Sequence, residues 1–170
     1  EIEIDNVPMN DEKTFALFAK GQTTGVFQFE SGPMREYLKQ LHPTSLNDLA
    51  AMNALYRPGP MEFIADFIDR KFGKKEVKYP HQILEPILKE TYGIIVYQEQ
   101  VIQIANKVGG MSLADADLLR RAMGKKDLKV MEDQKIVFVD GAIKNGVDKK
   151  TALEIFETIF KFANYGFNKS

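Results

Sequence analysis

Two stretches near the amino end of the chain alternate apolar and polar residues with a period of two. They are residues Glu1–Asp5 and Gly25–Phe29. Successive side chains of a strand point to opposite faces of a sheet, so this alternation is typical of short, half-buried strands. We therefore expect a small β element near the N-terminus.

From about Pro43 onward, apolar residues recur at the spacing of helices that bury one face. Thr44 or Ser45 can cap the first of these helices, and the turn Pro58–Pro60 stops it. Pro86 is compatible with a helix only in its first turn, so a helix in that region begins late or kinks. The expected helices cover about residues 46–52, 61–68, 81–90, 101–108, 112–123, 129–144 and 149–162.

The fold class that follows is mainly α, a helical bundle with a small β element near the N-terminus. We expect a small β/α lobe at about residues 1–42 and a helical body at about residues 43–170. The chain has 170 residues, of which 44% are apolar and 28% charged, as in ordinary globular domains. It has no run of about 18 apolar residues and no signal-like start, so we expect a cytoplasmic, monomeric chain without a membrane partner.

The composition excludes several kinds of site. The chain has no cysteine and only two histidines, which excludes a disulfide framework and a thiol nucleophile and leaves little material for a zinc site. The formal net charge is −1, so phosphate binding would need a local cluster of cations.

Such a cluster occupies residues 120–129, where five basic residues and one acid give a net charge of +4. Arg120 and Arg121 are adjacent on a helix that we expect to stop at Gly124, so both guanidinium groups can reach one side and grip phosphate oxygens. Lys125 and Lys126 follow. If the ligand is a triphosphate, they could bind it together with the arginines. We expect both arginines to face solvent, while the packing comes from Leu118, Leu119 and Ala122. Alternatively, these cations only complement the helix dipole in water.

A second candidate is the turn that follows the first helix of the body. Asn53, Tyr56 and Arg57 lie on or just before the proline-framed turn Pro58–Pro60. A stiff turn loses little entropy on binding, so an arginine and an aromatic ring placed there suit recognition of a ligand. A helix stop with a half-buried Tyr56 explains the pattern equally well.

Enzyme motifs that a single chain could carry are absent. The sequence around Gly124 lacks both the upstream glycine and the hydroxyl residue of a phosphate-binding G-x-x-x-x-G-K-[ST] loop. Asp115 and Asp117 are about 200° apart around a helix, so they cannot jointly hold a metal. We therefore expect no catalytic residue and no metal ligand in this chain.

Five ordered blocks of the chain resemble the C-family bacterial replicative DNA polymerases, represented by the alpha subunit of DNA polymerase III. The blocks are Leu17–Gly21 with Thr24–Ser31, Asn53–Pro60, Glu90–Val101, Asp117–Lys126 and Phe162–Ser170. In that family they belong to the fingers, and the aspartates that bind Mg²⁺ lie in an upstream palm. The family pattern continues past Ser170, so we expect the chain to be a fragment of a larger polymerase.

The resemblance implies that the fingers bind the incoming dNTP triphosphate and the DNA template-primer during replication. It favours Arg120, Arg121, Lys125 and Lys126 as triphosphate contacts, and Asn53, Tyr56 and Arg57 as contacts to the nucleotide or primer end. Other replisome subunits would bind through regions outside this chain, and the isolated chain should be inactive as a nucleotidyltransferase. The alternative is a helical protein-interaction module whose basic patch binds an acidic partner.

Overall fold

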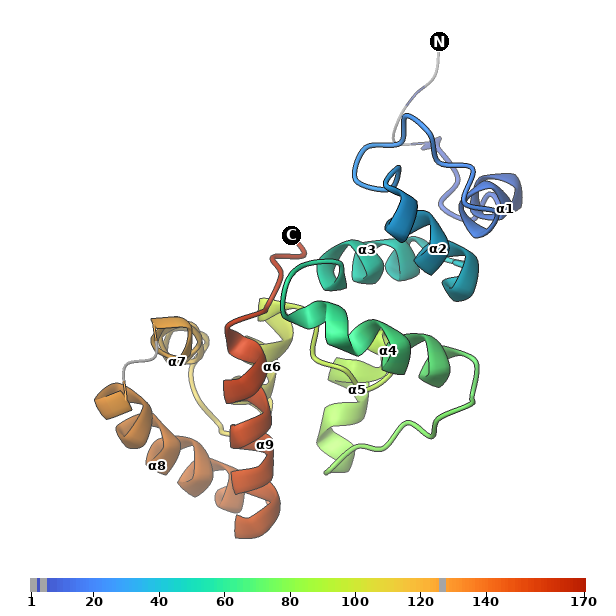
Figure 1. The fold of residues 1–170 in the computed structure, drawn as a ribbon. Helices are drawn as coiled ribbons and strands as arrows, with labels where there is room; N and C mark the ends of the chain where they lie inside the picture. Colours follow the sequence, from blue (N-terminus) through green and yellow to red (C-terminus); the bar gives the residue numbers. More distant parts are fainter. Residues whose placement is uncertain (1–2, 4–5, 126–127) are drawn as a thin grey trace. The chain divides into compact units, whose positions relative to one another are not determined.

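The computed structural model describes residue 3, residues 6–125 and residues 128–170, and these are mainly helical, as the sequence predicts (Figure 1). No helix in this described part is both long and apolar enough to cross a bilayer. The elements are α1 (Glu12–Ala19), α2 (Gly32–Leu41), α3 (Leu46–Leu55), η2 (Pro60–Phe63), α4 (Ile64–Lys71), η3 (Gln82–Leu84), α5 (Glu85–Leu88), η4 (Lys89–Thr91), α6 (Gln98–Lys107), α7 (Leu113–Lys125), α8 (Leu128–Lys144) and α9 (Lys149–Ala163), where η marks a 3-10 helix.

Several helix starts are fixed by side-chain caps. Ser45 accepts a hydrogen bond from the Asp48 backbone N–H (3.2 Å), so of the two expected caps it is Ser45 that begins α3. Ser112 accepts from the Asp115 N–H (3.1 Å) at the start of α7, as expected. The helix expected at residues 81–90 is instead three short pieces, η3, α5 and η4, because Pro86 fits only in the first turn of α5.

The small β element expected near the N-terminus is not supported. Four residues of the first expected strand, 1–2 and 4–5, lie outside the described residues. The second expected strand, Gly25–Phe29, is wrong: it forms turns. Gly25 and Gln28 have φ of +78° and +68°, which lie outside the β region, and the Thr23 hydroxyl donates to the Phe29 carbonyl (2.6 Å) across the loop.

The chain divides into two compact units, Glu1–Ile68 and Asp69–Ser170. The division at about residue 42 stays a prediction, but in this grouping α3 belongs to the first unit. The buried apolar side chains of that unit come from α2, α3 and the start of α4, and include Met34, Leu38, Met52, Leu55 and Phe67.

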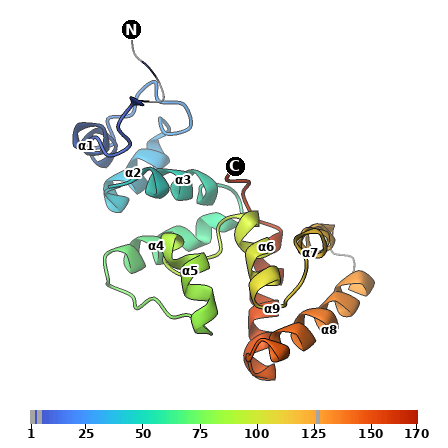
Figure 2. The same cartoon turned by 180° about the vertical axis from the view of Figure 1, so that it is seen from behind.

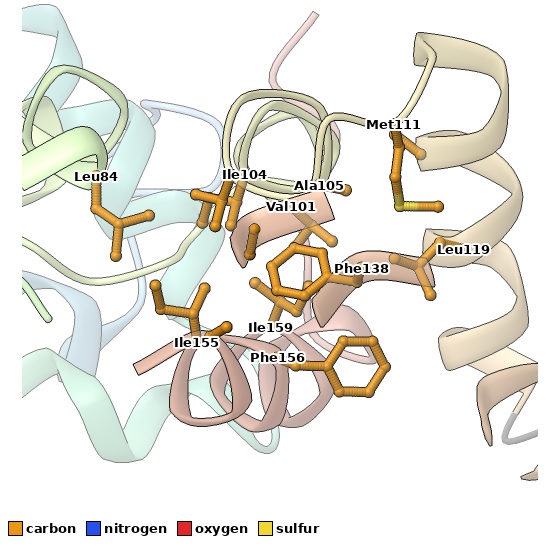
Figure 3. Packing of buried hydrophobic residues seen from close by; sticks show 14 of the residues in the cluster. Leu84, Val101, Ile104, Ala105, Met111, Leu119, Phe138, Ile155, Phe156 and Ile159 are labelled. Carbon is orange, nitrogen blue, oxygen red and sulfur yellow. The ribbon is translucent and has the colours of Figure 1, made fainter. Parts of the chain in front are cut away.

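The second unit has one contiguous apolar cluster (Figure 3). Phe138 of α8 points into its centre, with Ile104 of α6, Leu119 of α7 and Ile159 of α9 around it. The rings of Phe138 and Phe156 are tilted against each other, with centroids 5.5 Å apart. This cluster fixes α7, and therefore the basic residues that α7 carries.

The backbone of helix α8 lies directly against the backbone of the turn after α6. A Cβ atom on Gly141 would lie 1.8 Å from the carbonyl oxygen of Gly109, and a Cβ atom on Gly109 would lie 2.5 Å from the ring of Phe138. Both positions therefore require glycine because of tertiary packing.

Candidate functional site

Arg120 and Arg121 are held together by one carboxylate on their own helix. Nη2 of Arg120 lies 2.7 Å from Oδ1 of Asp117, and Nη2 of Arg121 lies 2.7 Å from Oδ2. Nε of Arg120 also donates to Oδ1 (3.2 Å). Residues three and four positions apart are neighbours on a helix surface, so Asp117 can bridge both cations and orient them towards one side.

The environment of Asp117 keeps it ionised. The hydrogen bond from Arg120 and the positive charges of both arginines hold the pKa of the Asp117 carboxyl below its usual range, although partial desolvation raises it. The three groups together carry one positive charge at neutral pH.

The two arginines differ in exposure. The Arg121 side chain is 63% exposed, whereas that of Arg120 is 24% exposed, so the expectation that both arginines face solvent holds for Arg121 and only in part for Arg120. In the part of the chain that the structure describes, the carboxylate that both guanidinium groups engage, Asp117, belongs to their own helix.

The packing face of α7 differs from expectation at one position. Leu119 is buried and Ala122 is half-buried, as predicted, but Leu118 is 60% exposed. The buried residues are Ala116, Leu119 and Met123, which recur every three or four positions. Leu118 precedes Arg121 by three positions and so shares the arginine face, and the expectation that it packs is wrong.

The end of α7 also differs. The helix continues through Gly124 to Lys125, so the stop expected at Gly124 is wrong. Lys125 is exposed, and Lys126 lies outside the described residues. In the orientation that satisfies its amide, Asn164 donates to the carbonyl oxygens of Met123 (3.3 Å) and Gly124 (3.2 Å). This contact satisfies two carbonyls in the last turn of α7, which have no partner within the helix.

The second expected group lies in the first unit and makes local contacts. Nδ2 of Asn53 donates to Oε1 of Gln28 (2.8 Å), and the rings of Tyr56 and Tyr37 meet edge to face with centroids 6.0 Å apart. Asn53 and Tyr56 are both half-buried. These contacts agree with the alternative that the turn is a helix stop with a half-buried Tyr56. They leave part of each side chain accessible.

Arg57 is less exposed than its place on the turn suggests. It is half-buried, and its Nε donates to the Ala54 carbonyl (2.8 Å). Desolvation lowers the pKa of its guanidinium, which still stays charged at neutral pH. Gly59 has φ of +100°, a backbone conformation that glycine adopts readily, so the turn depends on glycine at this position.

Sequence reasoning missed a third feature, the docking of the C-terminal segment onto the start of α6. Phe167 N–H donates to the Val96 carbonyl and Gln98 N–H donates to the Phe167 carbonyl, both at 3.0 Å, around an isolated parallel bridge between Tyr97 and Phe167. A Cβ atom on Gly166 would lie 3.1 Å from the Gln98 backbone, so this approach favours glycine.

Charged groups secure the end of the segment. The Glu99 carboxylate accepts from the backbone N–H of Lys169 (3.1 Å) and from the N–H and hydroxyl of Ser170 (3.4 and 3.1 Å). Nζ of Lys169 lies 2.8 Å from Glu90 and 5.0 Å from the centre of the buried Tyr97 ring. Around these groups is a cavity of about 320 Å³. The only signal in the sequence was that both segments belong to blocks of the resemblance.

A buried glutamine lies beneath this docking site. Oε1 of Gln100 accepts from the N–H groups of Val96 (2.8 Å) and Tyr97 (3.0 Å), while Nε2 donates to the Ile87 carbonyl (3.3 Å) and the Thr91 hydroxyl (2.9 Å). Gln100 thus links the loop before α6, which receives the C-terminal segment, to α5 and η4.

Within residues 3, 6–125 and 128–170, no three His, Cys, Asp or Glu side chains come together as metal ligands would. The described residues therefore do not fit the Mg²⁺ ions that the resemblance implies.

Comparison with known proteins assigns most of the chain to one family. Residues 1–146 match the bacterial DNA polymerase III alpha subunit finger domain. The chain is 57% identical to DNA polymerase III subunit alpha of Halalkalibacterium halodurans, over 99% of this chain and 15% of that protein. It is 52% identical to that of Bacillus subtilis and 54% identical to that of Borreliella burgdorferi, in each case over 100% of this chain and 15% of the relative. The chain therefore spans about 15% of the length of these curated relatives.

Proposed function

The chain belongs to the bacterial DNA polymerase III alpha subunit finger domain family, and we propose that it forms the fingers of a replicative DNA-directed DNA polymerase. In this proposal the fingers bind the triphosphate of the incoming dNTP and contact the template-primer, while nucleotidyl transfer takes place in the whole polymerase. The relatives that support it carry the name of the polymerase subunit.

The observation that carries the triphosphate assignment is the shared carboxylate between Arg120 and Arg121. A guanidinium has five N–H donors in a planar fork, and Asp117 engages only part of each fork. The remaining donors can bind phosphate oxygens, which are the acceptors that charge-assisted hydrogen bonds favour. Because Asp117 already orders both side chains, less rotamer entropy is lost when a triphosphate binds.

Lys125 adds a point charge four positions after Arg121, on the same side of α7. The chain thus contributes binding and orientation of negatively charged oxygens. Asn53, Tyr56 and Arg57 are proposed to contact the nucleotide or primer end with the parts of their side chains that remain accessible.

Incorporation kinetics of a full-length polymerase carrying this chain test the proposal. We expect Arg120→Ala and Arg121→Ala each to lower kcat/KM for the dNTP by about tenfold to 150-fold, since a charge-assisted contact contributes about 1.5–3 kcal/mol. Lysine at either position should restore little, because it keeps the charge and loses the fork.

Lys144→Ala is the matched control, because Lys144 is an exposed cation at the end of α8. It should leave the kinetics unchanged. If the arginine variants match the parent at every dNTP concentration while the control behaves as expected, the triphosphate assignment is wrong.

A further inference from the structure

A second basic segment, Arg70–Lys78, comprises the last two residues of α4 and the first part of the loop that leads to η3. It contains five basic residues and one acid, a net charge of +4 in a chain whose total charge is −1. Its basic residues are Arg70, Lys71, Lys74, Lys75 and Lys78. The segment is not part of the site on α7.

We call this segment the basic loop. Hydrogen bonds fix its backbone at the start. The N–H groups of Lys74 and Lys75 both donate to the Asp69 carbonyl (2.8 and 3.2 Å), and Gly73 N–H donates to the Arg70 carbonyl (3.1 Å). Gly73 has φ of +69°, which suits glycine at a helix end. The lysines therefore project from an ordered turn.

The base of the loop packs against the backbone around Tyr92 and Gly93, within the second unit. Nη1 of Arg70 donates to the Tyr92 carbonyl (3.1 Å). Side-chain atoms of Val77 and Arg70 lie 3.0 and 3.1 Å from where a Cβ atom of Gly93 would be, so they pack directly on that backbone. Arg70 thus anchors the loop, and the exposed cations are Lys74, Lys75 and Lys78.

Complementing the dipole of α4 does not account for all of this charge. The dipole effect falls off within the last turn of a helix. Lys78 lies seven residues beyond Lys71, where α4 ends, and its side chain is 79% exposed. Glu76 is the one acid within the segment, and its carboxylate lies 3.1 Å from Nζ of Lys78.

An aromatic ring is exposed among these lysines. Phe72 is 46% exposed, and Nζ of Lys71 lies 5.7 Å from the centre of its ring. An exposed apolar ring bordered by cations is the combination with which proteins bind nucleic-acid strands, since bases stack on rings while cations neutralise phosphates.

The basic loop is separate from the arginine pair within the second unit. Figures 1 and 2 show it on the side of α5, with α6 and α9 between it and α7. A ligand at α7 therefore does not explain it.

We propose that the basic loop is a second nucleic-acid contact, which binds the DNA phosphate backbone through Lys74, Lys75 and Lys78 irrespective of base sequence. Phe72 adds stacking on an unpaired base when the strand is single. This inference rests on the proposed function, because it takes DNA as the ligand of the larger polymerase.

The test measures DNA affinity of a full-length polymerase carrying this chain, by fluorescence anisotropy with labelled duplex and with labelled single-stranded DNA over a range of salt concentrations. The variant is the triple substitution Lys74→Gln, Lys75→Gln and Lys78→Gln. We expect affinity to fall about tenfold or more near 0.1 M salt, and the slope of log K against log salt to become shallower by about two to three.

The matched control is Lys144→Gln, Lys149→Gln and Lys150→Gln, which removes the same charge from three exposed lysines around the α8–α9 turn. It should leave both the affinity and the salt slope near those of the parent. If the two triple variants bind DNA equally well, the basic loop is a solvated surface and the proposal is overturned.

Phe72→Ala distinguishes binding of single-stranded DNA from binding of duplex DNA. We expect it to weaken binding of single-stranded DNA about fivefold to 150-fold, since stacking of a base contributes about 1–3 kcal/mol, and to leave duplex affinity unchanged. Unchanged single-strand affinity overturns the stacking role. If the full-length polymerase incorporates no nucleotide, the proposed function is refuted. If the polymerase is active and both triple variants bind DNA equally well, only the DNA-binding role of the basic loop is refuted.

Discussion

Replacing Gln100 with leucine tests whether the buried amide holds the loop that receives the C-terminal segment. Leucine has a similar size, but it removes the acceptor of two backbone N–H groups and the donor to two oxygens. Gln100 is 3% exposed, so water cannot readily replace these partners.

The magnitude follows from the two buried N–H groups, those of Val96 and Tyr97. Each unsatisfied buried donor costs about 1–3 kcal/mol, so we expect Gln100→Leu to lower the free energy of unfolding by roughly 2–6 kcal/mol. Small domains have a total stability of about 5–15 kcal/mol, so this is a large share. Gln100→Glu retains acceptor oxygens at its carboxylate but removes the amide donor, and it places a charge in a buried site.

Urea unfolding followed by circular dichroism measures the loss, and amide hydrogen exchange locates it. Exchange at Val96 and Tyr97 should accelerate in Gln100→Leu more than exchange in α8. Gln103→Leu is the matched control, because Gln103 is exposed on the same helix and its replacement should change stability by about 0.5 kcal/mol or less. A loss below about 1 kcal/mol for Gln100→Leu, similar to that of the control, would refute the network as a stabilising feature.

Two further predictions concern backbone approach and pH. Gly141→Ala should destabilise the chain by about 3 kcal/mol in urea unfolding, because its Cβ atom would overlap a backbone carbonyl, whereas Gly124→Ala, with open space at that position, should not destabilise it. Partial burial raises the pKa of Glu99, but hydrogen bonds from Lys169 and Ser170 outweigh this and lower it overall, so its contribution to stability is present above the unfolded pKa and is lost as pH falls through the folded one. Unfolding measured from pH 6 to pH 3 should therefore show a smaller acid-dependent loss in Glu99→Gln than in the parent, and identical pH profiles would contradict the role of this carboxylate.

The sequence by itself determined the mainly helical class and several helix starts after residue 43, among them those of α3, α7 and α9, but it did not indicate α1 or α2. Apolar spacing and caps such as Ser45 and Ser112 act within one or two turns, so they can be read from neighbouring residues. The pairing of Arg120 with Arg121 on one side of a helix is equally local, as is the fixed geometry of the turn at Gly59. The triphosphate contact proposed for these arginines comes from the family resemblance.

Only the tertiary structure decided which apolar residues are buried and which distant segments meet. The strand expected at Gly25–Phe29 was wrong because alternation gives no information on the sign of φ or on whether a partner strand exists. Leu118 is exposed although its neighbour is buried, because the positions of α6, α8 and α9 set the buried face of α7. The docking of Phe167 beside Tyr97 joins residues 70 positions apart, and no local pattern encodes such a contact. Local periodicity selects the elements, but the free energy of packing between them selects the contacts that form a site.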